Sequence, residues 1–194
     1  MRKIERKDIL DILEYEKTRV RLQARVREIK LDRRLAVGRY LTFIFENRDT
    51  VIFQIQEMMR VERTVREERI ADEIEVYNSM IPDAGELSAT LMIEIIEERQ
   101  IKPVLDRFLG IDNGQTAWLQ FGVERVFAVF EGGRSDETNI SAVHFLRFPF
   151  SESQVRRFRS REDEAWLHVR HGTYRAKALL ADGPRSALIQ DLAT

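Results

Sequence analysis

The apolar positions of the first part of the chain predict helix rather than strand. Ile12 and Leu13 follow acidic residues suited to capping a helix, and Leu22 and Val26 belong to a second apolar set at helical spacing. The second set is out of phase with the first, so one straight helix would leave one set in solvent. The pattern therefore predicts two short helices, or one helix with a break near residues 16–19.

Further along, the pattern changes from strand to helix and back. Residues 35–45 are rich in aromatic and branched side chains, which favours a strand. Residues 50–66 fit both a strand and a helical face, but their length and the acidic cap at their start favour a helix. A second helix is expected over residues 67–80, a buried strand over 87–96 and a short helix over 102–109.

The second half consists of short aromatic-rich segments separated by turn residues, which is typical of an antiparallel meander. These segments are residues 117–121, 125–130, 142–148, 165–171 and 174–180. Helices are expected over residues 156–160 and 184–192. The sequence thus predicts one α+β domain over residues 1–194, a helical N-terminal half packed on a mainly antiparallel β-sheet. Its helix-rich lobe would span about residues 1–112 and its β-rich lobe about 113–194.

The composition is that of a globular protein, with 43% hydrophobic and 34% charged residues in 194. The chain has no cysteine, which excludes disulfides, thiol catalysis and cysteine-ligated iron–sulfur clusters. No apolar segment follows the charged N-terminus, and no apolar run reaches the roughly 18 residues that a membrane helix needs. We therefore expect a cytoplasmic protein without a membrane partner.

The net charge of −1 argues against a strongly basic nucleic-acid-binding protein. The charge is uneven, because a basic first segment is followed by an acidic middle. The arginines of residues 156–161 could contact phosphates, but the acidic residues 162–164 follow them directly. This stretch is better interpreted as a self-compensating helix end, and we expect no nucleic-acid partner.

Polar residues lie inside two stretches that are apolar enough to form a core, residues 39–63 and 75–96. A carboxylate in such surroundings needs a partner, since an unpaired buried charge costs several kcal/mol. We therefore predict a polar network or a ligand site built from these stretches. Its candidate members are Arg39, Glu46, Arg48, Gln56, Glu57, Arg60, Glu62, Tyr77, Asn78, Glu86 and Glu94.

Two interpretations of these residues stay open. Glutamates that converge from separate elements could bind a metal or transfer protons, whereas arginines nearby could simply pair with them. Helical spacing places Glu62 on an apolar face, and strand spacing does the same for Glu94. We expect a shared network that joins at least one of these two to partners elsewhere in the set. The expected partners are Arg60 or Arg39 together with Tyr77 or Asn78.

No familiar metal or catalytic motif occurs. The Glu-x-x-His pattern of four-helix di-iron proteins is absent, as are the phosphate-loop, dinucleotide-binding and nucleophile-elbow patterns. Three histidines suffice for zinc, but strand phase points His168 and His171 to opposite faces, away from a common site with His144. We expect no metal and no cofactor, and no catalytic residue can be assigned.

Two blocks of sequence resemble a bacterial family of proteins of unknown function with the serial designation three-five-zero-one. The first block runs from Tyr40 through Phe45-Glu46-Asn47-Arg48-Asp49-Thr50 to Glu62, and the second from Tyr77-Asn78 through Gly85-Glu86-Leu87-Ser88 to Ile95. Near the C-terminus the family tends to a His-Pro-x-Tyr motif, which here reads His171-Gly172-Thr173-Tyr174. The departure from that motif removes any basis for a fixed role of His171.

The resemblance implies a gene neighbourhood rather than an activity. Members of the family are often encoded beside rubrerythrin, a di-iron peroxide reductase, and an iron–sulfur oxidoreductase. This implies a non-catalytic accessory of a peroxide-defence system, with one of these proteins as its partner. The residues themselves also leave open an enzyme or a small-ligand or metal-binding protein with a glutamate-rich pocket, and a structural homodimer.

Overall fold

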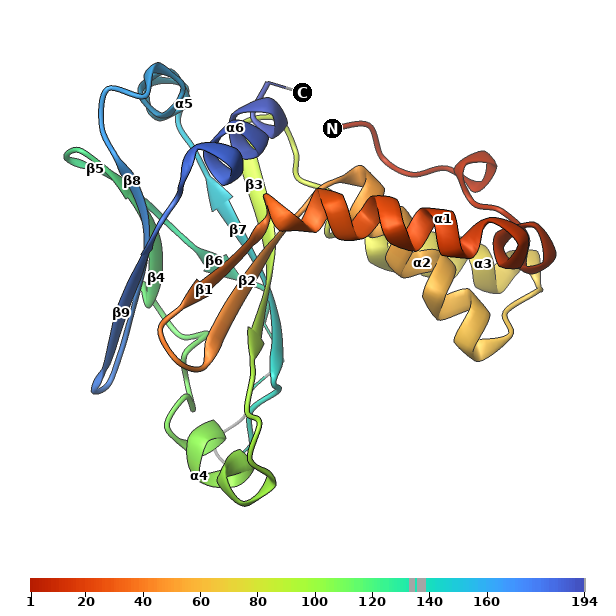
Figure 1. Cartoon of the computed structure of the whole chain (residues 1–194), viewed down its shortest axis with the longest axis horizontal. Coiled ribbons are helices and arrows are strands. Elements are labelled where there is room, and N and C mark those ends of the chain that lie inside the picture. The colour runs from red at the N-terminus through yellow and green to blue at the C-terminus, as the bar shows by residue number, and fades with distance from the viewer. Residues whose placement is uncertain (133–134, 136–138, 194) are drawn as a thin grey trace.

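The computed structural model, which describes residues 1–132, 135 and 139–193, is an α+β fold, as the sequence predicts. Two antiparallel sheets pack face to face, and a group of helices projects from the outer face of the larger sheet (Figure 1). The larger sheet has the strand order β1-β2-β3-β7-β6, and the smaller has the order β5-β4-β8-β9. Both halves of the chain contribute to the larger sheet, because β3 pairs with β7.

The strands are short, and successive side chains along them point alternately to the inner and the outer face of the sheet. The larger sheet consists of β1 (Arg34–Val37), β2 (Leu41–Glu46), β3 (Glu86–Ile93), β7 (Val143–Pro149) and β6 (Val129–Phe130). The smaller sheet consists of β5 (Glu124–Phe127), β4 (Ala117–Phe121), β8 (Ala165–His171) and β9 (Tyr174–Leu179). In β4 the burial pattern alternates residue by residue, as expected for a strand with one face on the core.

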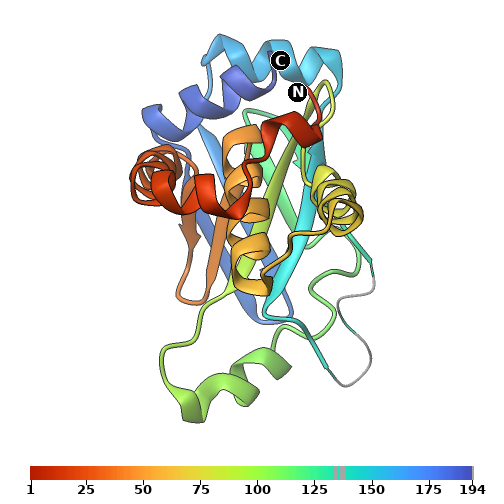
Figure 2. The ribbon, with the colours of Figure 1, turned by 90° about the vertical axis from the view of Figure 1, so that its right-hand side faces the viewer.

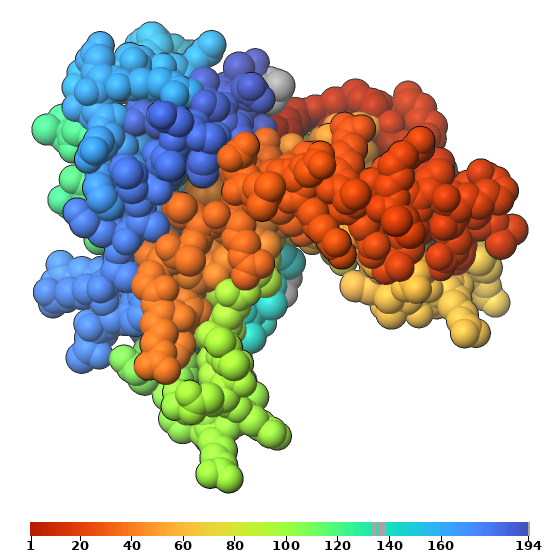
Figure 3. All heavy atoms as spheres, in the orientation of Figure 1, coloured from red at the N-terminus to blue at the C-terminus, as the bar shows by residue number. Residues whose placement is uncertain are grey.

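Three helices form an arm that lies over the outer face of the larger sheet and extends away from it (Figures 2 and 3). They are α1 (Ile12–Leu31), α2 (Arg48–Glu62) and α3 (Glu67–Asn78). The remaining helical segments are η1 (Arg6–Asp8), η2 (Glu98–Gln100), α4 (Ile101–Asp106), α5 (Glu152–Ser160) and α6 (Asp182–Asp191). None of the helices described is long and apolar enough to cross a membrane.

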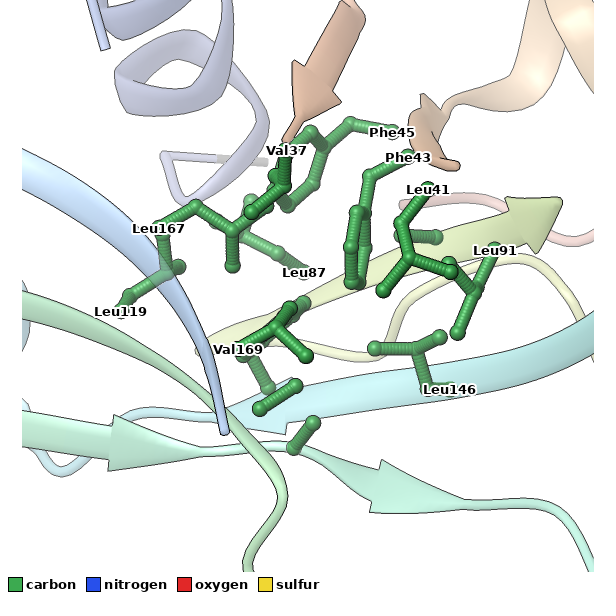
Figure 4. Packing of buried hydrophobic residues seen from close by; sticks show 14 of the residues in the cluster. Val37, Leu41, Phe43, Phe45, Leu87, Leu91, Leu119, Leu146, Leu167 and Val169 are labelled. Atoms are coloured by element: carbon green, nitrogen blue, oxygen red, sulfur yellow. The ribbon is translucent and has the colours of Figure 1, made fainter. Parts of the chain in front are cut away.

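The two sheets enclose one hydrophobic core, and a second hydrophobic core lies between the arm and the larger sheet. In the first core, side chains such as Phe43 and Leu91 of the larger sheet meet Leu119 and Leu167 of the smaller one (Figure 4). In the second core, apolar residues of α2, α3 and the N-terminal segment pack with Phe145 of β7. The larger sheet is therefore covered on both faces, and polar side chains on its outer face are buried beneath the arm.

The predicted break in the first helix is wrong, because α1 runs without interruption over 20 residues. The inward face is set by Tyr15, which is fully buried, together with Leu22 and Val26 two and three turns further on. Leu13, which the sequence pattern assigned to the core, is 75% exposed. The large aromatic side chain therefore decides the phase of the helix, and the apolar residues at its start do not.

The predicted strand over residues 35–45 is two strands that form a hairpin. Gly38 lies in the turn between β1 and β2 with φ +74°, a conformation that side chains other than glycine disfavour. The predicted helices over residues 50–66 and 67–80 are confirmed as α2 and α3, although Asn47 caps α2. The predicted meander is wrong, because β5 and β6 join different sheets and β7 pairs with β3.

Candidate functional site

Two of the predicted polar residues fasten the N-terminal segment to the arm. Gln56 Oε1 accepts a hydrogen bond from the backbone N–H of Leu10 at 2.7 Å, and Gln56 Nε2 donates one to the carbonyl of Leu10 at 3.1 Å. The Asn78 amide makes the same pair of bonds with Ile4, at 2.8 and 3.0 Å. Each side chain satisfies a backbone donor and acceptor as a neighbouring strand would, so both serve the fold.

Glu57 and Arg60 belong to ion pairs between α1 and α2. The Glu57 carboxylate accepts hydrogen bonds from Tyr15 Oη at 2.5 Å and from Arg19 Nε and Nη2 at 2.7 and 2.8 Å. Arg60 Nε donates to Glu16 at 2.8 Å. The hydrogen bond from Arg19, assisted by Tyr15, lowers the pKa of Glu57 to about 2.

We expect the free energy of unfolding of Glu57→Gln to fall less than that of the wild type when the pH is lowered. The pKa of Glu57 is about 2 in the folded protein against an ordinary 4.5, so its contribution is fully present above pH 4.5. It is lost as the pH falls from that value towards 2, and it amounts to at most about 3 kcal/mol. Urea unfolding at several pH values measures the change. Glu152→Gln, at a side chain that is 95% exposed, is the control, and equal acid dependence in both variants would contradict the expectation.

Three further candidates lie apart from one another. Arg48 pairs with Asp8 at 2.5 Å, and hydrogen bonding from the guanidinium lowers the pKa of that carboxyl. Arg39 is exposed in the β1–β2 turn, with its guanidinium 5.2 Å from the centre of the Tyr40 ring. Tyr77 is half-buried, and burial followed by nearby carboxylates raises the pKa of its hydroxyl. These residues form no common site.

The expected network around Glu62 and Glu94 is wrong. Glu62 is exposed at the end of α2, where the arm extends beyond the sheet. Glu94 lies just beyond β3, where its 43% exposed side chain accepts from Arg34 Nη2 and Thr42 Oγ1, each at 2.6 Å. Neither carboxylate contacts the arginines that the sequence suggested, because spacing gives the face of an element but not how far the cover over that face extends.

The buried carboxylate of this protein is Glu46, at the end of β2. It is 3% exposed and accepts hydrogen bonds from three neutral donors in two neighbouring elements. The donors are Thr50 Oγ1 at 2.5 Å, Gln54 Nε2 at 3.0 Å and Thr90 Oγ1 at 2.6 Å. Among the described residues, no lysine, arginine or histidine lies within ion-pair distance of Glu46. The group is therefore buried and hydrogen-bonded but has no cationic partner.

A cavity of about 240 Å³ opens beside this carboxylate, between the outer face of the larger sheet and the segment that follows α3. Its wall is mainly apolar, with a few polar groups. Residues whose side chains line it include Glu46, Met80, Ser88, Val129, Glu131, Phe145 and Arg147. Strand register explains the polar groups, because Glu46 pairs with Ser88 and Ser88 pairs with Arg147 across three neighbouring strands. All three side chains therefore point to the same face.

Arg147 lies two strands from Glu46, which is a separation of about 10 Å between the backbones. Its guanidinium is held by Glu86 at 2.5 Å and by the Ser79 carbonyl. Glu86, another predicted candidate, thus neutralises Arg147 and leaves Glu46 without a cation. The cavity has a paired charge at one end and an unpaired carboxylate at the other.

The carboxylate can accept one more hydrogen bond. An ionised carboxylate has about four acceptor positions, and three are occupied here. Oε2 accepts from Thr50 and Gln54, whereas Oε1 accepts from Thr90 alone. The site can thus receive a donor or a cation from a molecule in the cavity. Sequence reasoning missed Thr90, Phe145 and Arg147, and only the pairing of β3 with β7 could have identified the last two.

The histidines lie in separate places. His144 is buried in β7, whereas His168 and His171 lie on opposite faces of β8 in the other sheet. In the part of the chain that the structure describes, no three His, Asp or Glu side chains gather closely enough to hold a metal ion. The glutamates of the candidate set are likewise distributed, and Glu46 is the only one of them that combines burial with an adjacent cavity.

Comparisons with known proteins extend the resemblance seen in the sequence. Residues 3–192 match the family described as "Protein of unknown function (DUF3501)". A crystal structure of a protein of unknown function from Burkholderia pseudomallei K96243 is similar, with 28% sequence identity and a TM-score of 0.90. The similarity covers 98% of this chain and 100% of that one. No curated protein matches the chain.

Proposed function

We infer that this chain, which belongs to the DUF3501 family, binds a small organic molecule with a cationic or hydrogen-bond-donating head group in the cavity beside Glu46. The observation that carries this proposal is the Glu46 carboxylate itself. It is buried, held by three neutral donors and left with one acceptor position. Burying a charge without a cation is costly, and a bound cation would remove that cost.

The residues that line the cavity and its volume determine which ligand body can accompany the head group. Val129, Phe145 and Met80 offer apolar contacts to a flat or branched body. The volume of about 240 Å³ is at the small end of ligand pockets, so the molecule has few heavy atoms. A primary amine on a small aromatic body meets both requirements, since its ammonium group donates to carboxylates and its ring packs on phenylalanine.

Benzylamine is a suitable probe, with benzoate as its anionic counterpart. We expect calorimetric titration to show binding of benzylamine and none of benzoate, because the head group must meet a carboxylate. Glu46→Gln should weaken benzylamine binding at least tenfold, which corresponds to about 1.4 kcal/mol. Glu94→Gln removes a carboxylate from the same sheet outside the cavity and should leave binding unchanged. Equal affinity in the wild type and Glu46→Gln, or no binding of benzylamine at millimolar concentration, would contradict the proposal.

The accessory role in peroxide defence rests on the resemblance alone and is a separate proposal. Titration against the cognate rubrerythrin or iron–sulfur oxidoreductase would test it independently of the cavity. The homodimer alternative would be tested by sedimentation.

A further inference from the structure

The outer face of the smaller sheet gathers aromatic and basic side chains. Strand alternation directs the even-numbered residues of β4 and β8 and the odd-numbered residues of β5 and β9 to this face, because their neighbours are in the core. The rings are Trp118, Phe127, Trp166 and His168, and the cations are Arg125, Arg170, Arg175 and Lys177. Both tryptophans of the chain are therefore on one surface. No helix covers it in Figure 1 among the segments the structure describes.

The rings and the cations are interleaved. Trp118 and His168 are stacked with their centres 5.0 Å apart and their planes 8° from parallel. Lys177 Nζ lies 4.1 Å from the centre of the Trp166 ring, and the Arg125 guanidinium lies 5.8 Å from that of Trp118. A shallow hollow is lined by the Trp118–His168 stack and by Arg170, Arg175 and Lys177.

The cations of this face are not neutralised within the protein. All four are exposed, and within the described ranges none forms an ion pair. By contrast, two of the three arginines of α5 pair with carboxylates, Arg156 with Glu152 at 3.7 Å and Arg157 with Asp163 at 2.7 Å. An acidic group does contact a ring of this face at the end of the sheet, where Glu164 accepts a hydrogen bond from the Trp166 indole at 3.3 Å. The surface is therefore electropositive although the chain as a whole carries −1.

We propose that this face binds single-stranded nucleic acid, with bases against the Trp118–His168 stack and phosphates on the surrounding cations. Proteins that bind single strands without sequence preference combine a basic surface with aromatic side chains on which bases stack. A second copy of the chain is a poor occupant, because four cations would face four cations. The low net charge of the chain predicts no nucleic-acid partner, but a chain-wide average does not reveal the charge of a local surface.

The test uses a fluorescein-labelled oligothymidylate of about 12 nucleotides, a length within the range bound by single-strand-binding domains. We expect the fluorescein anisotropy to rise to a plateau as protein is added. We also expect the intrinsic tryptophan fluorescence to be quenched, because both indoles lie on the proposed binding surface. Binding to single strands weakens with salt in proportion to the phosphates contacted. Four contacts predict a loss of about 50-fold in affinity when the salt concentration rises fourfold.

Charge reversal separates this face from general electrostatics. Arg175→Glu with Lys177→Glu should reduce affinity at least tenfold. Arg21→Glu with Arg27→Glu makes the same change in net charge on exposed residues of α1 and should alter it less than threefold. His168→Ala should reduce both affinity and quenching. Equal losses in the two double variants, or no binding at low salt, would overturn the proposal. So would a poly-glutamate peptide that binds as tightly as the oligonucleotide, because it would indicate an acidic protein partner instead.

Discussion

Asp191→Asn is expected to lower the free energy of unfolding by about 3–5 kcal/mol, since it leaves a buried guanidinium without its counter-ion. Arg33, which follows α1, donates through Nη2 to Asp191 Oδ1 at 2.9 Å and through Nη1 to Oδ2. Both side chains are only 6% exposed. The pair joins the start of the larger sheet to α6 at the other end of the chain, so its loss affects the packing of both.

The matched control is Glu94→Gln, which removes the carboxylate of an exposed pair. Arg34 and Glu94 are 52% and 43% exposed, and such pairs contribute about 0–1 kcal/mol. Urea unfolding of the two variants at neutral pH gives the comparison. A loss below about 1 kcal/mol for Asp191→Asn, or an equal loss in both variants, would show that Arg33 finds another partner or water when Asp191 loses its charge.

Gly38→Ala is expected to destabilise the protein by about 2–4 kcal/mol through two effects that act together. The residue has φ +74°, where a Cβ is strained. The added methyl group would also overlap the Tyr174 hydroxyl, which donates to the Val37 carbonyl at 2.5 Å. This contact fastens the β1–β2 hairpin to β9, so the variant should weaken the junction between the two sheets.

Gly114→Ala isolates the backbone effect. Gly114 has φ +81°, but a Cβ there would meet no atom within 4 Å. We expect a loss of about 1 kcal/mol, which is the strain alone. Thermal or urea unfolding of both variants measures the difference. Similar losses at Gly38 and Gly114 would mean that Tyr174 moves aside at little cost.

The type of nearly every element could be predicted from the sequence, but its partner could not. Strand β8 has the predicted bounds, because alternation and turn residues are local signals. Residues 125–130 read as one strand, yet they divide between two sheets at Ala128. Which strands pair depends on contacts between distant parts of the chain, and no local period carries that information.

For the candidate site, the sequence likewise predicts the type of residue but not which residue is buried. The predicted set contained Glu46, Glu86 and nine others, and periodicity could not rank them by burial. Glu62 and Val61 lie on a helix whose end projects past the sheet, and Val61 is 69% exposed. Glu46 is the last residue of β2, and it is buried because α2 folds back over that strand. Depth in a fold depends on what covers a face, which spacing does not reveal.

A crystal structure with benzylamine tests the role of Glu46 most directly. The ammonium nitrogen should lie at about 2.7–2.9 Å from Glu46 Oε1, the length of a charge-assisted hydrogen bond. The ring should lie among Val129, Phe145 and Met80, which line the cavity. A cavity without benzylamine at saturating concentration, or an amine whose nitrogen points away from Glu46, would contradict the proposal that this carboxylate is kept for a ligand.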